Sequence, residues 1–283
     1  MQKFALFDGK PILKKALPRY NSIAKKEEQA AVRVVREELL SGFVGRAGDY
    51  FLGGKYVKEL EKRFREYFNV KYAVSFNSAS TALQAAVGAL GIGPGDEVIT
   101  SPYTMSSTAS AVLFNNALPV FADIEENSFC LDPESIKKNV SKKTKAILAV
   151  NMHGGSADYG PILKIIRKRK LKIIEDNAQS AGATYKRKFT GTIGDIGIFS
   201  FNVHKIIQCG EGGVLVTNNK KYGFRAQLIR NHGEAVINDL CKLPNGKRSF
   251  EPILGNNYRL SEIHAAIAIE QFKKMDKLNK QRI

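Results

Sequence analysis

The chain has 283 residues, of which 43% are hydrophobic, so it is long enough to bury one large core. No apolar run reaches the ~20 residues that a membrane-spanning helix needs, and the first ten residues lack the apolar core of a secretory signal. The formal net charge is +17, but the basic clusters at 167–170 and 186–188 carry no interleaved aromatic residues. We therefore interpret the charge as a solvated surface that also suits an anionic substrate, and expect no nucleic-acid or membrane partner.

The cysteines and histidines are scattered. Cys130, Cys209 and Cys241 are odd in number and far apart, which argues against a disulfide framework and favours a cytoplasmic protein. The four histidines form no pair at metal-ligand spacing. We expect no metal site.

The predicted elements begin with two helices. Apolar residues at helical spacing, Val32, Val35 and Leu39, predict the first over 27–41, and a similar pattern predicts the second over 56–68. The glycine-rich segment 41–54 between them is predicted to be a loop. Short apolar runs then predict strands at 72–76, 97–100, 118–122, 146–150, 172–175, 196–201 and 213–217. Further helices are predicted at 80–91, 104–115, 134–139, 160–170 and 220–230.

This alternation of strands and helices indicates the fold class. It predicts a mostly parallel sheet covered by helices on both faces, a three-layer α/β/α architecture. In such a sheet ligands bind at the carboxyl ends of the strands. Polar residues that follow the strands are therefore the candidates for a site.

Two charged residues lie at such strand ends. Lys205 follows the strand at 196–201 and precedes a glycine-rich turn, although a lysine there is also compatible with a simple exposed loop. The strand at 172–175 ends in Glu175, and Asp176 and Gln179 follow it. An aspartate at this point can cap a helix, but only small residues follow, and a carboxylate can instead hold a protonated pyridine nitrogen.

The segment 76–90 supplies a third element. A polar turn opens a helix, and its free N–H groups with the hydroxyls of Ser78, Ser80 and Thr81 are suited to bind phosphate. An ordinary N-cap is equally compatible with this segment alone. A lysine, an aspartate and a phosphate-binding turn are what pyridoxal 5'-phosphate (PLP) requires of a protein.

With these three elements, the chain resembles a known family, the DegT/DnrJ/StrS sugar aminotransferases. They are PLP-dependent enzymes of fold type I related to aspartate aminotransferase. The resemblance extends from "FDGKPI" over nearly the whole chain. The ordered blocks that carry it are "GIGPGDEVITSPYT", "PVFADIEENSFCLDPESI", "IIEDNAQSAGA", "GDIGIFSF" with Lys205 and "GEGG", "RNHG", and "NNYRLSEIHAAIAIEQ".

The resemblance implies roles for individual residues. Lys205 aligns with the lysine that forms a Schiff base with the cofactor, and Asp176 with the residue that pairs with the pyridine nitrogen; these two are the expected catalytic residues. Gln179 aligns with a residue near the 3'-oxygen of the cofactor. The other expected cofactor-binding residues are Ser200 and the pair Ala79 and Ser80 at the phosphate, Met105 where the family has a stacking aromatic residue, and Asn257, whose counterpart reaches the phosphate of the neighbouring subunit.

The resemblance also implies an activity. The expected reaction moves an amino group from glutamate to a keto sugar, normally linked to a nucleoside diphosphate, in amino-sugar, cell-surface polysaccharide or antibiotic-sugar biosynthesis. A homodimer with shared active sites is expected. Two alternatives stay open: a related sugar dehydratase, in which histidine replaces the lysine, and a protein that binds the cofactor without turnover or has a regulatory role. His204 is adjacent to the retained Lys205.

Family members usually continue into a smaller C-terminal domain, and this chain is expected to lack most of it. The expected organisation is an N-terminal arm and helix over 1–50, a PLP-binding large domain over 51–235, and the incomplete start of a small domain over 236–283. The terminal segment "KLNKQRI" and the segment "SEIHAAIAIEQF" are predicted to be helical, the latter with an apolar face that contains Ile263, Ala266, Ile267 and Ile269.

Overall fold

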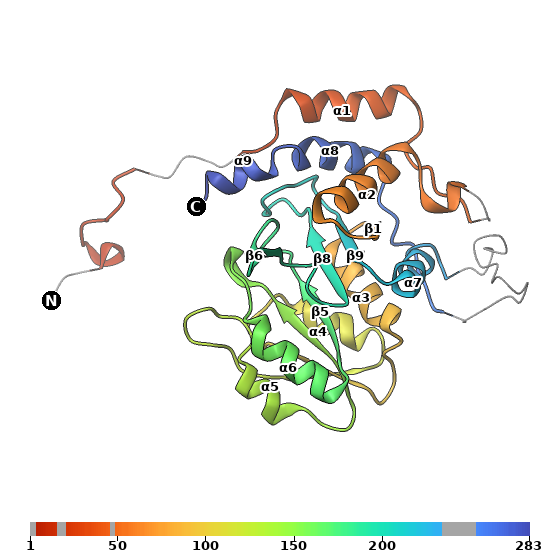
Figure 1. The fold of residues 1–283 in the computed structure, drawn as a ribbon. Coiled ribbons are helices and arrows are strands. Elements are labelled where there is room, and N and C mark those ends of the chain that lie inside the picture. The colour runs from red at the N-terminus through yellow and green to blue at the C-terminus, as the bar shows by residue number, and fades with distance from the viewer. Residues whose placement is uncertain (1–3, 16–20, 46–48, 234–252) are drawn as a thin grey trace, which may run out of the picture.

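A seven-stranded sheet forms the centre of the molecule in the computed structural model, which describes residues 4–15, 21–45, 49–233 and 253–283 (Figure 1). The spatial order of its strands is β1-β9-β8-β5-β4-β2-β3. Their bounds are β1 Tyr72–Phe76, β2 Glu97–Thr100, β3 Leu118–Phe121, β4 Thr144–Val150, β5 Lys172–Asp176, β8 Ile196–Ser200 and β9 Gly213–Thr217. All seven strands predicted from the sequence are present.

Strand β9 runs against the others. It pairs antiparallel with β1 and with β8, whereas β8-β5, β5-β4, β4-β2 and β2-β3 are all parallel pairs. Six strands therefore point the same way, and their carboxyl ends lie at one edge of the sheet. The predicted three-layer fold with a mostly parallel sheet is confirmed.

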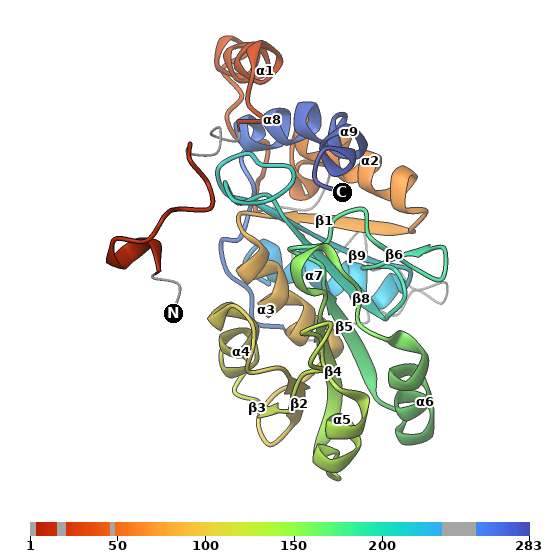
Figure 2. The same ribbon diagram turned by 90° about the vertical axis from the view of Figure 1, so that its left-hand side faces the viewer.

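Helices cover both faces of the sheet. Figure 2 shows α3 and α4 on one side of the strands and α5 and α6 on the other. Helix α7 packs against α3, and α2 lies over β1 and β9. The helix bounds are α2 Lys55–Phe68, α3 Ala79–Leu90, α4 Ser106–Leu113, α5 Pro133–Asn139, α6 Tyr159–Arg169 and α7 Lys220–Arg230. These agree with the predicted helices to within two residues at each end.

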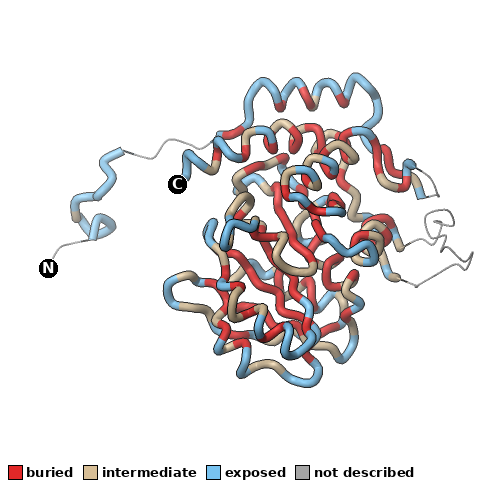
Figure 3. The backbone as a smooth tube through the Cα atoms, viewed as in Figure 1, coloured by how far each residue is buried: buried red, intermediate tan, exposed pale blue. Residues whose placement is uncertain are grey.

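Alternate strand residues enter two separate cores. In β8, Ile198 belongs to the cluster under α3, while Phe199 belongs to the cluster under α2. The same alternation occurs in β9, where Leu215 and Val216 face opposite sides. The strands are buried over most of their length except for β3 at the edge of the sheet, where Leu118 and Phe121 are exposed. Figure 3 shows the buried residues gathered in the middle of the molecule. The apolar residues on both strand faces therefore fix the sheet as the middle layer of the fold.

Helix α1, Lys25–Arg36, has its apolar residues on two stripes. Val32, Val35 and Leu39, which predicted this helix, are exposed, and the buried apolar residues are Ala30 and Val34. The helix itself is confirmed, but it ends before the predicted 41 and buries a different face. The reason is that α1 packs on α8 through the side of the helix that carries Ala30 and Val34.

The C-terminal helices close the outer layer. Helix α8, Glu262–Phe272, packs against α1 and α2 of the same chain, and α9, Met275–Lys280, follows it. Of the predicted apolar face, Ala266 and Ile269 are buried, whereas Ile263 and Ile267 are partly exposed. The Glu262 carboxylate accepts hydrogen bonds from the Gly54 and Tyr56 N–H groups at 3.0 and 2.7 Å, so it caps the start of α2.

Some short elements of the structure were not predicted from the sequence, and some predictions concern residues outside the described ranges. The short hairpin of β6 (Thr184–Tyr185) and β7 (Lys188–Phe189) was not expected, because two-residue strands leave no periodic pattern. Short 3-10 turns lie at η1 Ala5–Phe7, η2 Asp49–Leu52 and η3 Met152–Gly154. No helix within the described ranges is long and apolar enough to cross a membrane. Cys241, residues 46–48 of the predicted loop, and the expected domain boundary at 235/236 lie outside the described residues.

Candidate active site

A cavity of about 310 Å³ opens at the carboxyl ends of β5 and β8, next to the start of α3. The strand register explains why distant segments meet there. Phe76, at the end of β1, is paired with Gly213 in β9, and Gly213 is paired with Ser200 at the end of β8. The loop that enters α3 and the loop that carries Lys205 therefore leave the sheet from neighbouring positions.

Asp176 ends β5 and is only 4% exposed in the cavity wall. Its Oδ1 accepts a hydrogen bond from the Ala178 N–H at 3.1 Å, and its Oδ2 accepts one from the Thr108 hydroxyl at 3.3 Å. Burial raises the pKa of this carboxyl, while the Ala178 hydrogen bond, the Lys205 charge and the Thr108 hydrogen bond lower it. The net direction is upward. A buried carboxylate whose pKa is raised is suited to hold a cationic ligand group.

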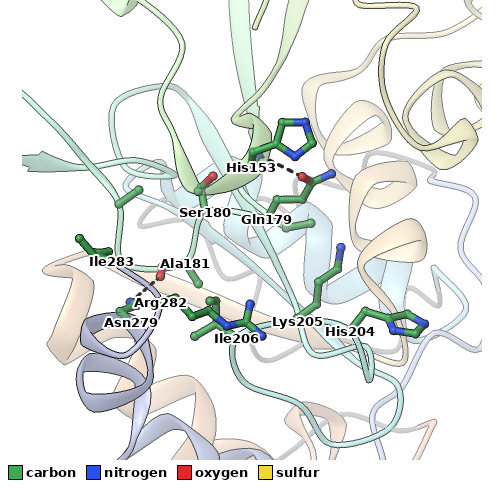
Figure 4. A pocket seen from close by; sticks show the side chains of 14 residues that line it. His153, Gln179, Ser180, Ala181, His204, Lys205, Ile206, Asn279, Arg282 and Ile283 are labelled. Carbon is green, nitrogen blue, oxygen red and sulfur yellow. Dashed lines mark hydrogen bonds between the residues drawn. The ribbon is translucent and has the colours of Figure 1, made fainter. Parts of the chain in front are cut away.

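Lys205 lies on the loop that follows β8. Asn202 organises this loop: its carbonyl accepts from the Lys205 N–H at 2.9 Å, its side-chain oxygen accepts from the His204 N–H at 3.2 Å, and its amide donates to Glu211 at 2.8 Å. Lys205 is partly buried and lines the cavity, and in Figure 4 its side chain extends toward Gln179. His204 is exposed and points away from Gln179 (Figure 4).

The start of α3 forms the opposite wall. Ser78 is the N-cap, and its hydroxyl accepts from the Thr81 N–H at 3.1 Å. Ala79 and Ser80 line the cavity, as does Ser200 from the end of β8. Because the first N–H groups of a helix have no partner within it, this wall is suited to bind an anion.

Thr81 does not belong to the site. Its hydroxyl donates to the Asn77 side chain at 2.7 Å, and it is not among the cavity residues. Asn257 is also absent from the cavity wall. It is exposed, its carbonyl lies 3.4 Å from the Asn77 amide that donates to it, and its side-chain oxygen accepts from Arg259 at 2.9 Å. Of the eight residues that the family resemblance predicts at the cofactor, the seven besides Asn257 line one cavity.

Gln179 and Met105 lie at the mouth. The Gln179 side-chain oxygen accepts from the backbone N–H of His153 at 3.1 Å, which leaves its amide group as the donor toward the cavity. Met105 precedes the first residue of α4 and is 70% exposed, so its thioether is accessible to a ligand. A second cavity of about 480 Å³ shares Gln179, His204 and Lys205 with the first (Figure 4).

Sequence reasoning missed several positioning residues. Thr108 binds Asp176, and Asn202 and Glu211 hold the Lys205 loop. They act through individual hydrogen bonds, which no periodic pattern reveals. For Asn202, its place between a strand and the lysine was the only available signal.

Taken together, the cavity places an amine, a buried carboxylate and a helix N-terminus around one space. These groups match a ligand with an anionic end, a cationic ring atom and an electrophilic carbon between them. With the sheet order and the single reversed strand, they define the large domain of PLP-dependent transferases of fold type I.

The family model for the DegT/DnrJ/EryC1/StrS aminotransferases matches residues 36–283, and the chain belongs to this family. GDP-perosamine synthase of Caulobacter vibrioides is 39% identical over 223 residues, which are 79% of this chain and 58% of that protein. The spore coat polysaccharide biosynthesis protein SpsC of Bacillus subtilis is 36% identical over 268 residues, 94% of this chain and 66% of that protein. The chain thus spans about three fifths of the length of these relatives.

Solved structures of similar proteins agree with this family assignment. The aminotransferase from Psychrobacter cryohalolentis superposes with a TM-score of 0.81 at 32% identity, over 93% of this chain and 65% of that chain. The GDP-4-keto-6-deoxy-D-mannose-3-dehydratase of E. coli, solved with bound hydrated PLP, superposes with a TM-score of 0.79 at 32% identity, over 91% of this chain and 67% of that chain. The family and fold type expected from the sequence are confirmed.

Proposed function

We propose that the protein is a PLP-dependent aminotransferase that moves an amino group from glutamate to a keto sugar linked to a nucleoside diphosphate. The observation that carries the proposal is the convergence of Lys205, Asp176 and the start of α3 on one cavity. Relatives that bear the names of a GDP-perosamine synthase and a spore coat polysaccharide biosynthesis protein support the sugar class.

The residues present fit the cofactor. Asp176 is buried without an ion-pair contact at its oxygens among the described residues, so a protonated pyridine nitrogen would supply the missing positive charge. Ser80, Ser200 and the first N–H groups of α3 would bind the phosphate, and the Gln179 amide would donate to the 3'-oxygen. Met105 would pack on the ring face.

Bound PLP stabilises negative charge on the carbon next to the transferred nitrogen and carries the amino group between donor and acceptor. The chain's own residues supply the rest. Asp176 keeps the proton on the ring nitrogen, because the charged carboxylate and the protonated nitrogen stabilise each other in a buried place. The Lys205 amine, at the cavity wall, would move a proton from the donor carbon to the cofactor carbon that bears the transferred nitrogen, and would move a proton in the opposite direction, to the acceptor carbon, in the second half-reaction.

One observation separates this proposal from the dehydratase alternative. Both residues line the cavity, but the Lys205 side chain extends toward Gln179, whereas the His204 side chain is exposed and points away from Gln179. A histidine in the role of the lysine would have to come from a different loop conformation. The amine at the cavity therefore favours transamination.

The proposal includes a homodimer in the cytoplasm. In the family the counterpart of Asn257 reaches the phosphate of the neighbouring subunit, and here Asn257 is exposed outside its own cavity, which is compatible with that role. Both cysteines within the described residues, Cys130 and Cys209, are free.

The test is to add PLP to the purified protein, record the visible absorbance, reduce with borohydride and locate the added mass by peptide mass spectrometry. We expect the mass on Lys205 and none in Lys205→Ala, with Lys273→Ala, an exposed control, labelled like the wild type. Glutamate should then convert the bound cofactor to its amine form, and a panel of nucleotide keto sugars should reverse the change. Labelling of another lysine, or a glutamate response in Lys205→Ala, would contradict the proposal.

A further inference from the structure

A cluster of three aromatic side chains lies beside the cofactor cavity, and the reaction proposed above does not use it. It consists of Tyr103, Phe129 and His153 and is called the aromatic platform below. The ring centroids are 5.5 Å apart for Tyr103 and Phe129, 6.1 Å for Tyr103 and His153, and 6.0 Å for Phe129 and His153. Each ring thus contacts the other two.

The platform comes from three separate loops. Tyr103 follows β2, Phe129 lies between β3 and α5, and His153 follows β4. Since β2, β3 and β4 are parallel, these loops leave the sheet at the same edge as Asp176 and Lys205. The sheet order places the platform on the side of β5 opposite β1, and therefore away from the start of α3, where the phosphate of the cofactor would bind.

Two short links connect the platform to the cavity. The His153 N–H donates to Gln179, and His153 lines the second cavity with Lys205. Tyr103 directly precedes Thr104 and Met105, which line the first cavity. A ligand that reaches from the cofactor toward solvent on this side meets the platform.

The rings remain accessible although they pack on one another. Tyr103 is 44% and Phe129 is 41% exposed, and His153 is exposed as well. Phe129 and His153 both have left-handed backbone, with φ of 56° and 53°, a conformation that is uncommon for residues other than glycine, although histidine adopts it more often than most. Strained residues of this kind persist where the surrounding structure holds them, and they gather at functional sites.

We propose that the aromatic platform binds the nucleobase of the nucleotide-sugar acceptor. Bases stack on aromatic faces whatever their identity, and the Tyr103 hydroxyl and the His153 ring nitrogens, 3.5 Å apart, can bond to polar atoms at a base edge. The base is the part of this substrate farthest from the reacting carbon, which matches a platform at the mouth. The inference rests on the proposed function, because it assigns a subsite to the acceptor proposed there.

The test is to measure the dissociation constants of GDP, UDP, dTDP, inorganic pyrophosphate and GDP-mannose by calorimetry. The variants are Tyr103→Leu, Phe129→Leu and His153→Leu, and the control is Phe114→Leu, at an exposed aromatic residue that follows the end of α4. We expect the wild type to bind at least one nucleoside diphosphate. Each platform variant should bind it about tenfold more weakly, because one stacking contact is lost, while pyrophosphate binding and Phe114→Leu stay unchanged.

The outcomes separate this inference from the proposed function. Failure of Lys205 labelling by PLP would overturn the function and leave the nucleotide measurement valid. Unchanged nucleotide affinity in all three variants would overturn the platform, whatever the labelling shows. A loss confined to GDP-mannose, with GDP unaffected, would assign the rings to the sugar and overturn the base subsite. In a protein that transaminates, Phe114→Leu should leave the glutamate half-reaction unchanged, since Phe114 lines neither cavity.

Discussion

Glu175 and Asp176 are consecutive residues of β5 whose carboxylates serve opposite faces of the sheet. Asp176 faces the cofactor cavity, whereas Glu175 accepts hydrogen bonds from the Gly191, Ile193 and Gly194 N–H groups at 2.7, 2.6 and 2.6 Å. Burial raises the pKa of both carboxyls. One side chain is fully used in holding a loop of the fold, and the other keeps its charge available for a ligand.

Glu175→Gln should therefore destabilise the protein. The amide has one oxygen in place of two, so an N–H of the 191–194 loop is left facing an NH2 group, at a cost of about 2 kcal/mol. Chemical unfolding with urea measures the change, and Glu66→Gln, an exposed site on α2, is the control. Stability equal to the wild type would mean that the three hydrogen bonds contribute nothing net.

Asp176→Asn should stabilise the ligand-free protein, and the gain in stability should depend on pH. A raised pKa means that the folded state holds its proton more tightly than the unfolded state, so stability falls as pH rises from the ordinary value of 3.8 through the folded pKa. Asparagine removes that penalty, on the order of 1 kcal/mol at neutral pH. Thermal unfolding at about pH 8 and about pH 5 should show the advantage shrinking toward acid. An advantage that is constant with pH would rule out the titration of Asp176 as its cause.

The same substitution should impair turnover. With the carboxylate charge gone, the ring nitrogen no longer keeps its proton, and we expect the rate of the glutamate half-reaction to fall by about 10²-fold or more, with a much smaller loss of cofactor affinity. Stopped-flow absorbance measures the first and equilibrium dialysis the second. Turnover at the wild-type rate would reduce Asp176 to a residue that caps the Ala178 turn.

Whether a feature of the fold or of the site could be predicted depends on the kind of pattern that it leaves in the sequence. The strands of the sheet and the helices that cover it were predicted correctly. Buried strands such as 196–201 form short apolar runs, and helices such as 56–68 repeat their apolar residues at helical spacing. The buried face of α1 could not be predicted, since Val32 and Val35 form a stripe as regular as Ala30 and Val34 and only the position of α8 distinguishes them. Seven of the residues that the family resemblance predicts at the cofactor, Lys205 and Asp176 among them, line one cavity, and their roles stay predictions. Thr108 and Asn202 were missed because single hydrogen bonds across the fold leave no pattern.

Gly213 is the last glycine of the "GEGG" segment, and its surroundings explain why this position has no side chain. A methyl group at this position would lie 2.7 Å from both Cα and N of Ala79, so β9 and the start of α3 approach each other only because residue 213 has no side chain. Gly213→Ala should displace the first turn of α3 and weaken the binding of pyridoxamine phosphate by about tenfold or more. Gly93→Ala is the control, since a methyl there meets only one atom at 3.8 Å. Affinity equal to the wild type would show that α3 does not bind the phosphate.

Asn257 provides the test of a shared active site. It lies outside the cavity of its own chain, next to Asn77 and bonded through its side chain to Arg259. In the family its counterpart completes the phosphate site of the other subunit. If this holds here, a Lys205→Ala chain contributes an intact Asn257 to its partner, and an Asn257→Ala chain contributes an intact Lys205.

Mixed Lys205→Ala and Asn257→Ala chains should then recover activity. After partial dissociation and reassociation, the hybrid dimer contains one complete site and one doubly defective site, so an equal mixture, which is half hybrid at random exchange, should reach about one quarter of the wild-type activity per subunit. Native mass spectrometry verifies the exchange. In the matched control, the Lys205→Ala chain is mixed with an Asn256→Ala chain, which carries the substitution at the neighbouring residue. Confirmed exchange without any gain above the Asn257→Ala value would mean that each site is built within one chain. A monomer by light scattering at micromolar concentration would contradict the dimer itself.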